Sequence, residues 1–519
     1  MVKPKMAKIL EKVKGFGKNL VELLTLKNNF LFFVLILACL VISYQYRNRF
    51  YWSYPPIAET FDEFAYAWLG LSLFETGIPT SWSFIPDYIK GVPEGARLNF
   101  EGTRISVDGV APTRQNFSSF PKPIMHVQEF DFDGYRSQFN LVMPYLEQPP
   151  LGGLIISLPL ILTGEDDFSQ ISLFDIRKQF PLIGTIATLL VIIIGNIWYG
   201  RRVALTSGFL YATVPTIVLG SRLALPENIL VPVLLAQIIF LELYERDKKR
   251  VFVLLAYLIA FFAPLIKPFG FSAALVGAIF FILRRRNFKE VGIFVLLGLF
   301  SFLTYAIYAI SYDRNTFFSV LAYQSSRFFS GPHILLYKIL IPKITKIFLD
   351  GWIFFGWLAL GILAFRNNSS KHTSLMLSFF SYLFVIAFFG GENFGWYRFP
   401  LYPFLLISAG YLIVEILKKP LIFASLLFIG TGAASSFAWG LGIYDWSPYL
   451  LQFRIFIVIA SLILGFQVLF KSKYSRLLAS GFLFLIFIAS LYLNTRVINR
   501  VAEIWPRLGD DSSLIIGRR

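Results

Sequence analysis

The sequence is poor in the residues that build disulfides and metal sites. It has a single cysteine, Cys39, so no disulfide can form within the chain and no metal site can rest on thiolates. Its three histidines, His126, His333 and His372, lie far apart and lack the spacing of a metal-binding motif. We therefore expect no disulfide, and a function that requires neither a metal nor another cofactor.

Charged residues are also scarce. They make up 15% of the 519 residues, whereas hydrophobic residues make up 56%, and the mean hydropathy is +0.64. Apolar runs long enough to cross a bilayer recur through most of the chain, which predicts a polytopic membrane protein. The formal net charge is +17, but Lys and Arg fall in short clusters between apolar runs, as the positive-inside bias requires. We therefore expect no nucleic-acid partner.

Basic clusters set the predicted topology. Residues 1–28 are rich in lysine and predict a cytoplasmic amphipathic helix that leads into an uncleaved first span at residues 29–45. Further clusters mark the same side of the membrane at residues 246–250, 284–289, 366–371, 418–419 and 471–476. Pairs of apolar spans lie between them, at residues 226–244, 251–266, 269–283, 290–311, 347–365, 372–389, 399–416, 420–438, 452–470 and 477–493.

Three more apolar segments, at residues 149–163, 178–198 and 203–220, fit this topology only if one of them does not cross fully. The first is the shortest and is the best candidate. With that choice we expect an all-α polytopic protein with about 13 crossings, its N-terminus inside and its C-terminus outside. The transmembrane domain covers residues 29–493, and residues 494–519 form a short tail.

Two long loops face the outer side in this topology. The first, residues 46–148, is too long for a plain connector and is expected to be functional. It opens with an amphipathic helix near residues 60–71 that suits a membrane interface. Residues 96–109 alternate polar and apolar side chains and contain turn glycines, which favours a small β-hairpin. The second loop, residues 312–345, is rich in aromatic residues and is expected either to close over the site as a lid or to lie at the interface as a helix.

Two adjacent carboxylates, Asp62 and Glu63, open the amphipathic helix of the first loop. Thr60, three residues before Glu63, fits a capping box, and acids in a first helical turn are favoured by the helix dipole. This accounts for Glu63 better than for Asp62. The local pattern alone favours a structural role for the pair. Together with the other charged groups on the same face of the membrane, and with the family resemblance given below, the pair becomes the candidate catalytic site, with Asp62 as the general base and Glu63 capping the helix or positioning Asp62.

Several other charged groups meet the same face of the membrane. Lys267 lies between Pro264 and Pro268, which break the helix, and a cation in such a break can bind a lipid-linked phosphate. Any single charged side chain at a bilayer boundary is more often an anchor than a catalytic group. We therefore base the candidate site on the presence of several such side chains on one face of the membrane. The other candidates for substrate binding are Arg222 and Glu227 in one junction, and Tyr397 and Arg398 in another.

The order of these motifs resembles the GT-C superfamily of polyprenyl-phosphate-dependent glycosyltransferases, in the branch of protein O-mannosyltransferases and lipid A aminoarabinose transferases. An acidic pair follows the first span, Pro149-Pro150-Leu151-Gly152 enters the next apolar segment, a junction runs from Ser221 to Glu227, and Tyr397-Arg398-Phe399-Pro400 comes late. The resemblance is best over residues 55–280. It implies a GT-C fold and a catalytic base at Asp62.

The chain departs from the family pattern at two of these positions. Gln148 stands where family members often carry a histidine or lysine that helps to hold the donor, so we expect Lys267 or Arg222 to carry more of the phosphate contact. Glu227 stands where aspartate is commoner. Gln148 and Glu227 remain in the predicted substrate-binding set.

The resemblance implies a hexosyl- or pentosyltransferase that moves a sugar from a polyprenyl-phosphate donor to an acceptor hydroxyl on the outer side, with inversion. Asp62 would deprotonate the hydroxyl, and Lys267, Arg222 or Arg398 would stabilise the departing phosphate. The acceptor is a protein, a lipid or a glycan. We expect the enzyme in the plasma membrane, with its site facing outside.

Three other functions stay open from the residues alone. A transporter or flippase of lipid-linked sugars would also be polytopic and place charges in the membrane, although transporters usually show repeats and interrupted helices near the midplane. A polysaccharide polymerase or ligase would centre on a large late loop. A structural membrane protein predicts that Asp62, Arg222 and Lys267 lie far apart.

Overall fold

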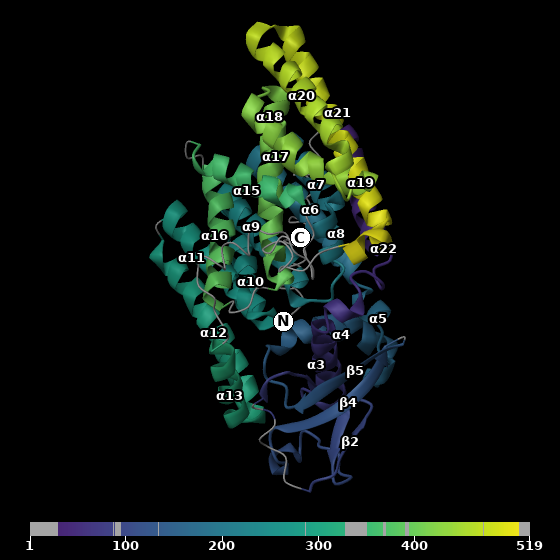
Figure 1. The fold of residues 1–519 in the computed structure, drawn as a ribbon. Helices are drawn as coiled ribbons and strands as arrows, with labels where there is room; N and C mark the ends of the chain where they lie inside the picture. The colour runs from purple at the N-terminus through teal and green to yellow at the C-terminus, as the bar shows by residue number, and fades with distance from the viewer. Residues whose placement is uncertain are drawn as a thin grey trace.

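The computed structural model describes residues 30–86, 88, 95–132, 134–285, 287–326, 350–366, 370–389, 394–470 and 472–507. A bundle of helices forms most of this part of the chain, and a small β domain lies at one end of it (Figure 1). The predicted basic helix, most of the second long loop and the end of the predicted tail lie outside the described residues.

The helices of the bundle follow the predicted spans closely. Those that each match one predicted span are α2 (Phe30–Asn48), α6 (Phe180–Tyr199), α9 (Pro226–Asp247), α10 (Arg250–Ile266), α11 (Phe271–Arg285), α12 (Phe288–Tyr312), α15 (Gly351–Ala364), α16 (Ser370–Phe389), α17 (Tyr402–Lys418), α20 (Leu450–Phe470) and α21 (Lys473–Asn499). The segment predicted at residues 203–220 is broken into α7 (Arg201–Thr213) and α8 (Pro215–Gly220), because Pro215 cannot continue the hydrogen-bond ladder of α7. The remaining helices are α3 (Asp62–Thr76), α4 (Pro150–Thr163), α5 (Leu173–Arg177), α13 (Arg314–Ser325), α18 (Ile422–Phe428), α19 (Ala434–Leu441) and α22 (Val501–Ile504).

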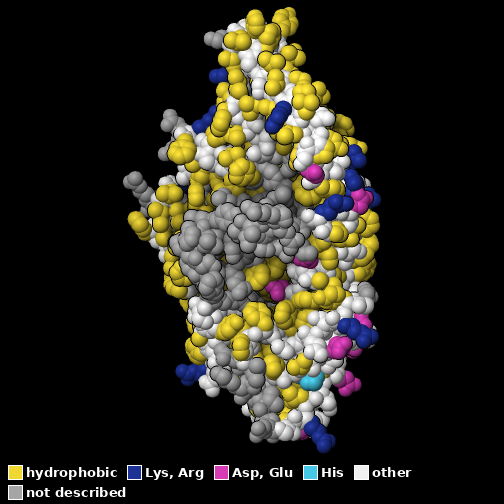
Figure 2. Space-filling model, viewed as in Figure 1, with side chains coloured by type: hydrophobic (Ala, Val, Ile, Leu, Met, Phe, Trp, Pro, Cys, Tyr) yellow, Lys and Arg dark blue, Asp and Glu magenta, His cyan; other side chains and the backbone are white. Residues whose placement is uncertain are grey.

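The composition of these helices confirms a polytopic membrane fold. Among the described residues, 9 helical segments are long and apolar enough to cross a membrane, and four shorter apolar helices accompany them. On the face drawn in Figure 2, hydrophobic side chains cover much of the helical part. Helix α4 has 14 residues and is therefore about 21 Å long, short of a hydrocarbon core of about 30 Å. This agrees with the expectation that it does not cross fully, while the number of crossings stays a prediction.

The β domain is built from the first long loop. Strand β2 (Leu98–Glu101) pairs with β3 (Arg104–Val107), which confirms the predicted hairpin. Gly102 turns the chain with a φ of +62°, which only glycine adopts freely. A second, larger antiparallel sheet has the strand order β1-β5-β4 and was not predicted. Its strands are β1 (Ser81–Trp82), β4 (Ile124–Phe132) and β5 (Tyr135–Met143).

Helix α3 packs against the larger sheet through aromatic side chains. Trp68 is fully buried and stacks on Phe168 with ring centroids 4.9 Å apart. The same indole contacts Phe130 of β4 and Phe139 of β5. Each aromatic side chain buries 150–250 Å² in a typical core, so this cluster fixes the orientation of α3 and of the carboxylates at its start.

Glycines bring α3, α4 and α10 together at the base of the β domain. A Cβ on Gly153 of α4 would lie 2.9 Å from the carbonyl oxygen of Tyr66 in α3. A Cβ on Gly152 would overlap the carbonyl oxygen of Ile266, the last residue of α10. The Pro-Pro-Leu-Gly-Gly stretch therefore serves close helix packing, and it brings the end of α10 against the start of α4.

Candidate active site

Two cavities lie where the first loop meets the bundle, and they share one wall. The larger has a volume of about 630 Å³ and the smaller about 50 Å³. Both are lined by Glu147, Gln148, Lys267 and Tyr397. The shared residues come from the end of the first loop, the break after α10 and a 3-10 segment before α17, so three distant parts of the chain form one site.

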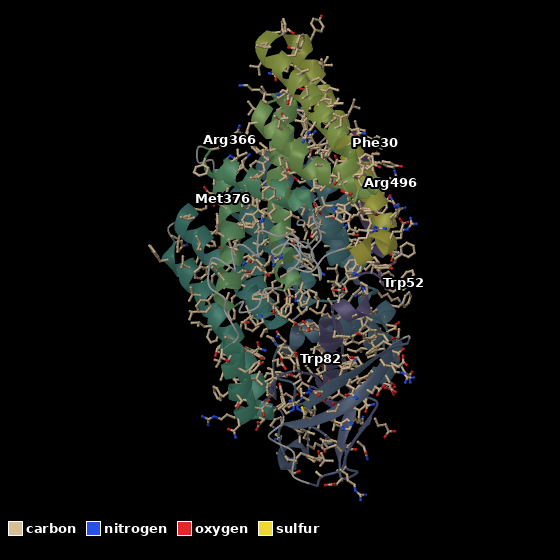
Figure 3. The ribbon with its side chains drawn as sticks, viewed as in Figure 1. Phe30, Trp52, Trp82, Arg366, Met376 and Arg496 are labelled. Carbon is tan, nitrogen blue, oxygen red and sulfur yellow. The ribbon has the colours of Figure 1, made fainter. Side chains whose placement is uncertain are left out.

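Asp62 and Glu63 point in different directions from the first turn of α3. Asp62 is half-buried and lines the smaller cavity together with Trp82 of β1, which Figure 3 labels at the boundary between the bundle and the sheet. Glu63 is fully buried and lines neither cavity. Only Asp62 is placed to meet a molecule bound in the site.

Glu63 instead anchors the start of α3. Its carboxylate accepts hydrogen bonds from Arg177 Nε at 2.7 Å and from a second Arg177 nitrogen at 2.5 Å. It also accepts from the Thr60 hydroxyl and from the backbone N–H of Ala224, each at 2.6 Å. The predicted capping box is therefore wrong, because α3 is capped by Phe61 without a side-chain bond. Glu63 instead belongs to a buried ion pair that holds the first turn of α3, and its role in catalysis or in positioning Asp62 stays a prediction.

Arg177 extends this anchor to the chain before α3. One of its terminal nitrogens donates to the carbonyl oxygens of Tyr51 at 3.0 Å and Pro55 at 2.8 Å. The ion pair thus ties together α5, the connection from α2, the first turn of α3 and the turn before α9. Sequence analysis missed Arg177, because a single arginine in a short helix carries no recognisable motif.

Lys267 lies in the predicted helix break and faces the shared wall of the cavities. Its side chain is 6% exposed, and Nζ lies 3.5 Å from Glu227 Oε1. Nζ also donates a hydrogen bond to the Tyr66 hydroxyl, and it lies 4.8 Å from the ring centroid of Tyr66 and 5.8 Å from that of Tyr397. Pro268 ends α10 at this point and leaves the ammonium group at the end of a helix rather than within one.

Tyr66 stays a neutral hydroxyl beside this ammonium group. Burial, with the nearby carboxylates of Glu227 and Asp62, holds the pKa of Tyr66 well above its usual value. The neutral Tyr66 hydroxyl therefore adds no negative charge beside Lys267, whose ammonium group pairs with Glu227 and lies near two aromatic rings. The ammonium group of Lys267 lines both cavities, where it can contact an anionic ligand.

Gln148 lines both cavities as predicted, and its neighbour Glu147, which was not predicted, does so too. Glu147 accepts a hydrogen bond of 3.4 Å from Gln324 of α13. Helix α13 thereby forms part of the wall of the larger cavity. It occupies the start of the second long loop, and the proposed lid residues beyond it lie outside the described residues.

Two predicted phosphate-binding cations are placed elsewhere. Arg222 donates to the backbone oxygens of Tyr46 at 2.6 Å and Tyr54 at 3.3 Å, so it holds the chain between α2 and α3. Arg398 is 1% exposed. Among the described residues that line the two cavities, neither arginine is found. A contact of either arginine with the donor phosphate stays a prediction, whereas Tyr397, next to Arg398, lines both cavities.

No group of three or more His, Cys, Asp and Glu side chains placed to hold a metal ion occurs in the described ranges. The expectation that no cofactor is needed stays a prediction. The two cavities and their shared wall offer a carboxylate, an ammonium group, a polar amide and a large apolar surface.

One family model matches part of the sequence. Residues 147–311 match the family model of the dolichyl-phosphate-mannose-protein mannosyltransferases. This confirms the resemblance to polyprenyl-phosphate-dependent glycosyltransferases that the motifs indicate. The matched segment contains Gln148, Glu227 and Lys267, whereas Asp62 precedes it. No curated protein matches the sequence as a whole.

Solved structures with a similar arrangement share little sequence with this chain. ArnT from Cupriavidus metallidurans bound to undecaprenyl phosphate is 14% identical, and the alignment covers 92% of this chain and 79% of that one, with a TM-score of 0.47. The apo oligosaccharyltransferase from Archaeoglobus fulgidus is 13% identical, and the alignment covers 89% of this chain and 55% of that one, with a TM-score of 0.43.

Proposed function

We propose that the protein is a membrane glycosyltransferase that moves a sugar from a polyprenyl-phosphate donor to an acceptor hydroxyl. The observation that carries the proposal is that Asp62 and Lys267 line one cavity, although 205 residues separate them in the sequence. A structural membrane protein gives no reason for this convergence. The family match over residues 147–311 supports the same reaction class.

The larger cavity suits a lipid-linked donor. Its wall is mainly apolar and includes Pro264, Phe269, Phe302, Phe317 and Phe388, which favours an isoprenoid chain. Glu147, Gln148, Lys267 and Tyr397 line the wall shared with the smaller cavity, whereas Ser301, Gln324 and Ser325 line the larger cavity alone. A polyprenyl phosphate bound here would place its chain against the apolar wall and its phosphate beside Lys267 and Gln148.

Transfer then requires that the acceptor hydroxyl lies beside Asp62 and the donor phosphate beside Lys267. Asp62 accepts the proton of the acceptor hydroxyl, the hydroxyl oxygen forms a bond to the anomeric carbon, and the bond from that carbon to the phosphate oxygen breaks. The electron pair of that bond leaves with the polyprenyl phosphate, whose charge Lys267 stabilises. A single displacement inverts the anomeric centre, because attack and departure take place on opposite faces.

The reaction is assigned to the outer side of the plasma membrane. The β domain and the site lie at one end of the bundle, and Arg366, from a predicted cytoplasmic cluster, lies toward the other end (Figure 3). The positive-inside bias makes the end with the basic cluster cytoplasmic. The acceptor hydroxyl accordingly belongs to a molecule outside the cytoplasm.

The test is an assay of the purified protein with a panel of polyprenyl-phosphate sugars, followed by mass spectrometry of the acceptors and of the released lipid phosphate. We expect Asp62→Asn to lower transfer by about 10²- to 10⁴-fold. Glu415→Gln is the matched control, because Glu415 pairs with Lys418 on α17, away from both cavities. Full transfer by the folded Asp62→Asn protein would contradict the assignment of the base.

A further inference from the structure

Strand β5 has a sheet edge that β1 covers only in part. Neighbouring residues of a strand direct their N–H and C=O groups to opposite edges, so residues two apart share an edge. Ser83 N donates to Asn140 O at 2.9 Å on the side of β5 away from β4, and Gln138 and Arg136 must face the same side. Among the described residues, no backbone hydrogen bond reaches either residue on that edge.

The chain that forms β1 turns away from this edge after Ser83. Ile85 and Tyr88 pack with Val142 and Tyr145, at the other end of β5. The ladder that begins at β1 therefore stops beside Asn140. The described chain leaves the positions next to Gln138 and Arg136 open, and these side chains are exposed.

This open edge borders the candidate site. Trp82 and Phe84, next to the point where the ladder stops, line the smaller cavity with Asp62. Trp82 Nε1 donates to the carbonyl oxygen of Phe61 at 3.0 Å, and the Phe61 ring lies 5.8 Å from that of Tyr135 at the start of β5. Phe84 is 49% exposed and Tyr135 is 40% exposed. Aromatic side chains thus lie beside the edge where it approaches the smaller cavity.

We propose that this edge binds an extended segment of polypeptide by β-strand addition and presents a hydroxyl side chain of that segment to Asp62. Free N–H and C=O groups at ladder spacing are matched by an extended main chain, and aromatic walls suit its alternating side chains. Exposed aromatic rings alone would also suit a sugar, but the open ladder positions favour a peptide. The inference rests on the proposed function and specifies the class of acceptor.

The strand pair offers a matched test of this edge. Glu129 of β4 and Gln138 of β5 lie opposite each other, and their N–H groups point to opposite outer edges of the pair. Proline at either position leaves the ladder between β4 and β5 intact, because neither N–H lies between the strands. Only Gln138→Pro removes a donor from the edge beside Asp62.

The probe is a fluorescent, end-blocked peptide of alternating threonine and valine with a lysine at each end. With the full-length protein in detergent, we expect Gln138→Pro to weaken peptide binding by about five- to tenfold. Glu129→Pro should leave binding within about twofold. A peptide N-methylated at alternate residues should bind as weakly to the unaltered protein as the plain peptide binds to Gln138→Pro. Equal effects of the two prolines, or no effect of Gln138→Pro, would overturn the proposal.

Disulfide trapping tests the same contact without a proline. Cys39 is fully buried, so Gln138→Cys and Glu129→Cys each add one accessible thiol. A cysteine-containing version of the peptide should form a disulfide with Gln138→Cys and not with Glu129→Cys.

If the enzyme transfers sugar to a methyl glycoside or a lipid alcohol and no peptide is trapped, the edge proposal fails and the transferase stands. If no acceptor discharges the donor while the peptide is trapped, the proposed function fails instead.

Discussion

The buried ion pair between Glu63 and Arg177 predicts that Glu63 stabilises the fold, whereas its neighbour Asp62 acts in catalysis. Both side chains are fully buried, and the carboxylate of Glu63 accepts four hydrogen bonds, two of them from Arg177. Arg177→Met would remove those two and leave a buried anion with the Thr60 hydroxyl and the Ala224 N–H. Breaking a buried pair in this way costs about 3–5 kcal/mol. We expect the double variant Glu63→Leu/Arg177→Met to cost less than the sum of the single changes, because it leaves no unpaired charge.

The assay measures two quantities on each purified variant: the half-life at a fixed elevated temperature in detergent, and the transfer rate per folded molecule. We expect Arg177→Met and Glu63→Gln to shorten the half-life strongly and to keep transfer within about tenfold of the unaltered enzyme. Asp62→Asn should show the reverse pattern. If Glu63→Gln abolished transfer while the half-life stayed unchanged, Glu63 would act on the substrate and the separation of roles would be refuted.

Three further predictions follow from the site and its supports. Lys267→Met should lower transfer by about 10²- to 10³-fold, while Lys418→Met should not, as measured by released lipid phosphate. Gly152→Ala should destabilise the protein by about 1–3 kcal/mol, because its Cβ would overlap a backbone oxygen, whereas Gly292→Ala, with open space around it, should not shorten the thermal half-life. Transfer should persist after dialysis against EDTA, and a loss that Mg²⁺ or Mn²⁺ restores would show that the reaction needs a metal.

The membrane fold could be predicted from the sequence because hydropathy and charge act locally. Each span depends on its own apolar residues and on the basic cluster beside it, so the predicted segments and the helices agree to within a few residues. The hairpin at residues 98–107 was also predictable from its alternation and its turn glycine. The longer β4–β5 hairpin was not predictable in the same way, because the polar residues His126 and Gln128 interrupt the apolar face of β4 between Ile124 and Phe130.

The site was only partly predictable, because side-chain direction depends on tertiary contacts. Asp62 and Glu63 are neighbours in the sequence, but only the position of Arg177 decides which of them is buried. Arg222 and Lys267 each lie near a proline at a membrane boundary. Nothing in the local sequence distinguishes Arg222, which binds backbone oxygens, from Lys267, which lines a cavity. Nothing in the local sequence distinguishes Glu147 from any other acidic residue in a loop.

The most direct test of the central claim is an experimental structure of the protein with a bound polyprenyl phosphate. We predict that the lipid chain lies in the larger cavity and that a phosphate oxygen lies within about 4 Å of Lys267 Nζ, with Asp62 facing the same space. A phosphate bound away from Lys267, or a lipid bound away from Asp62, would contradict the account.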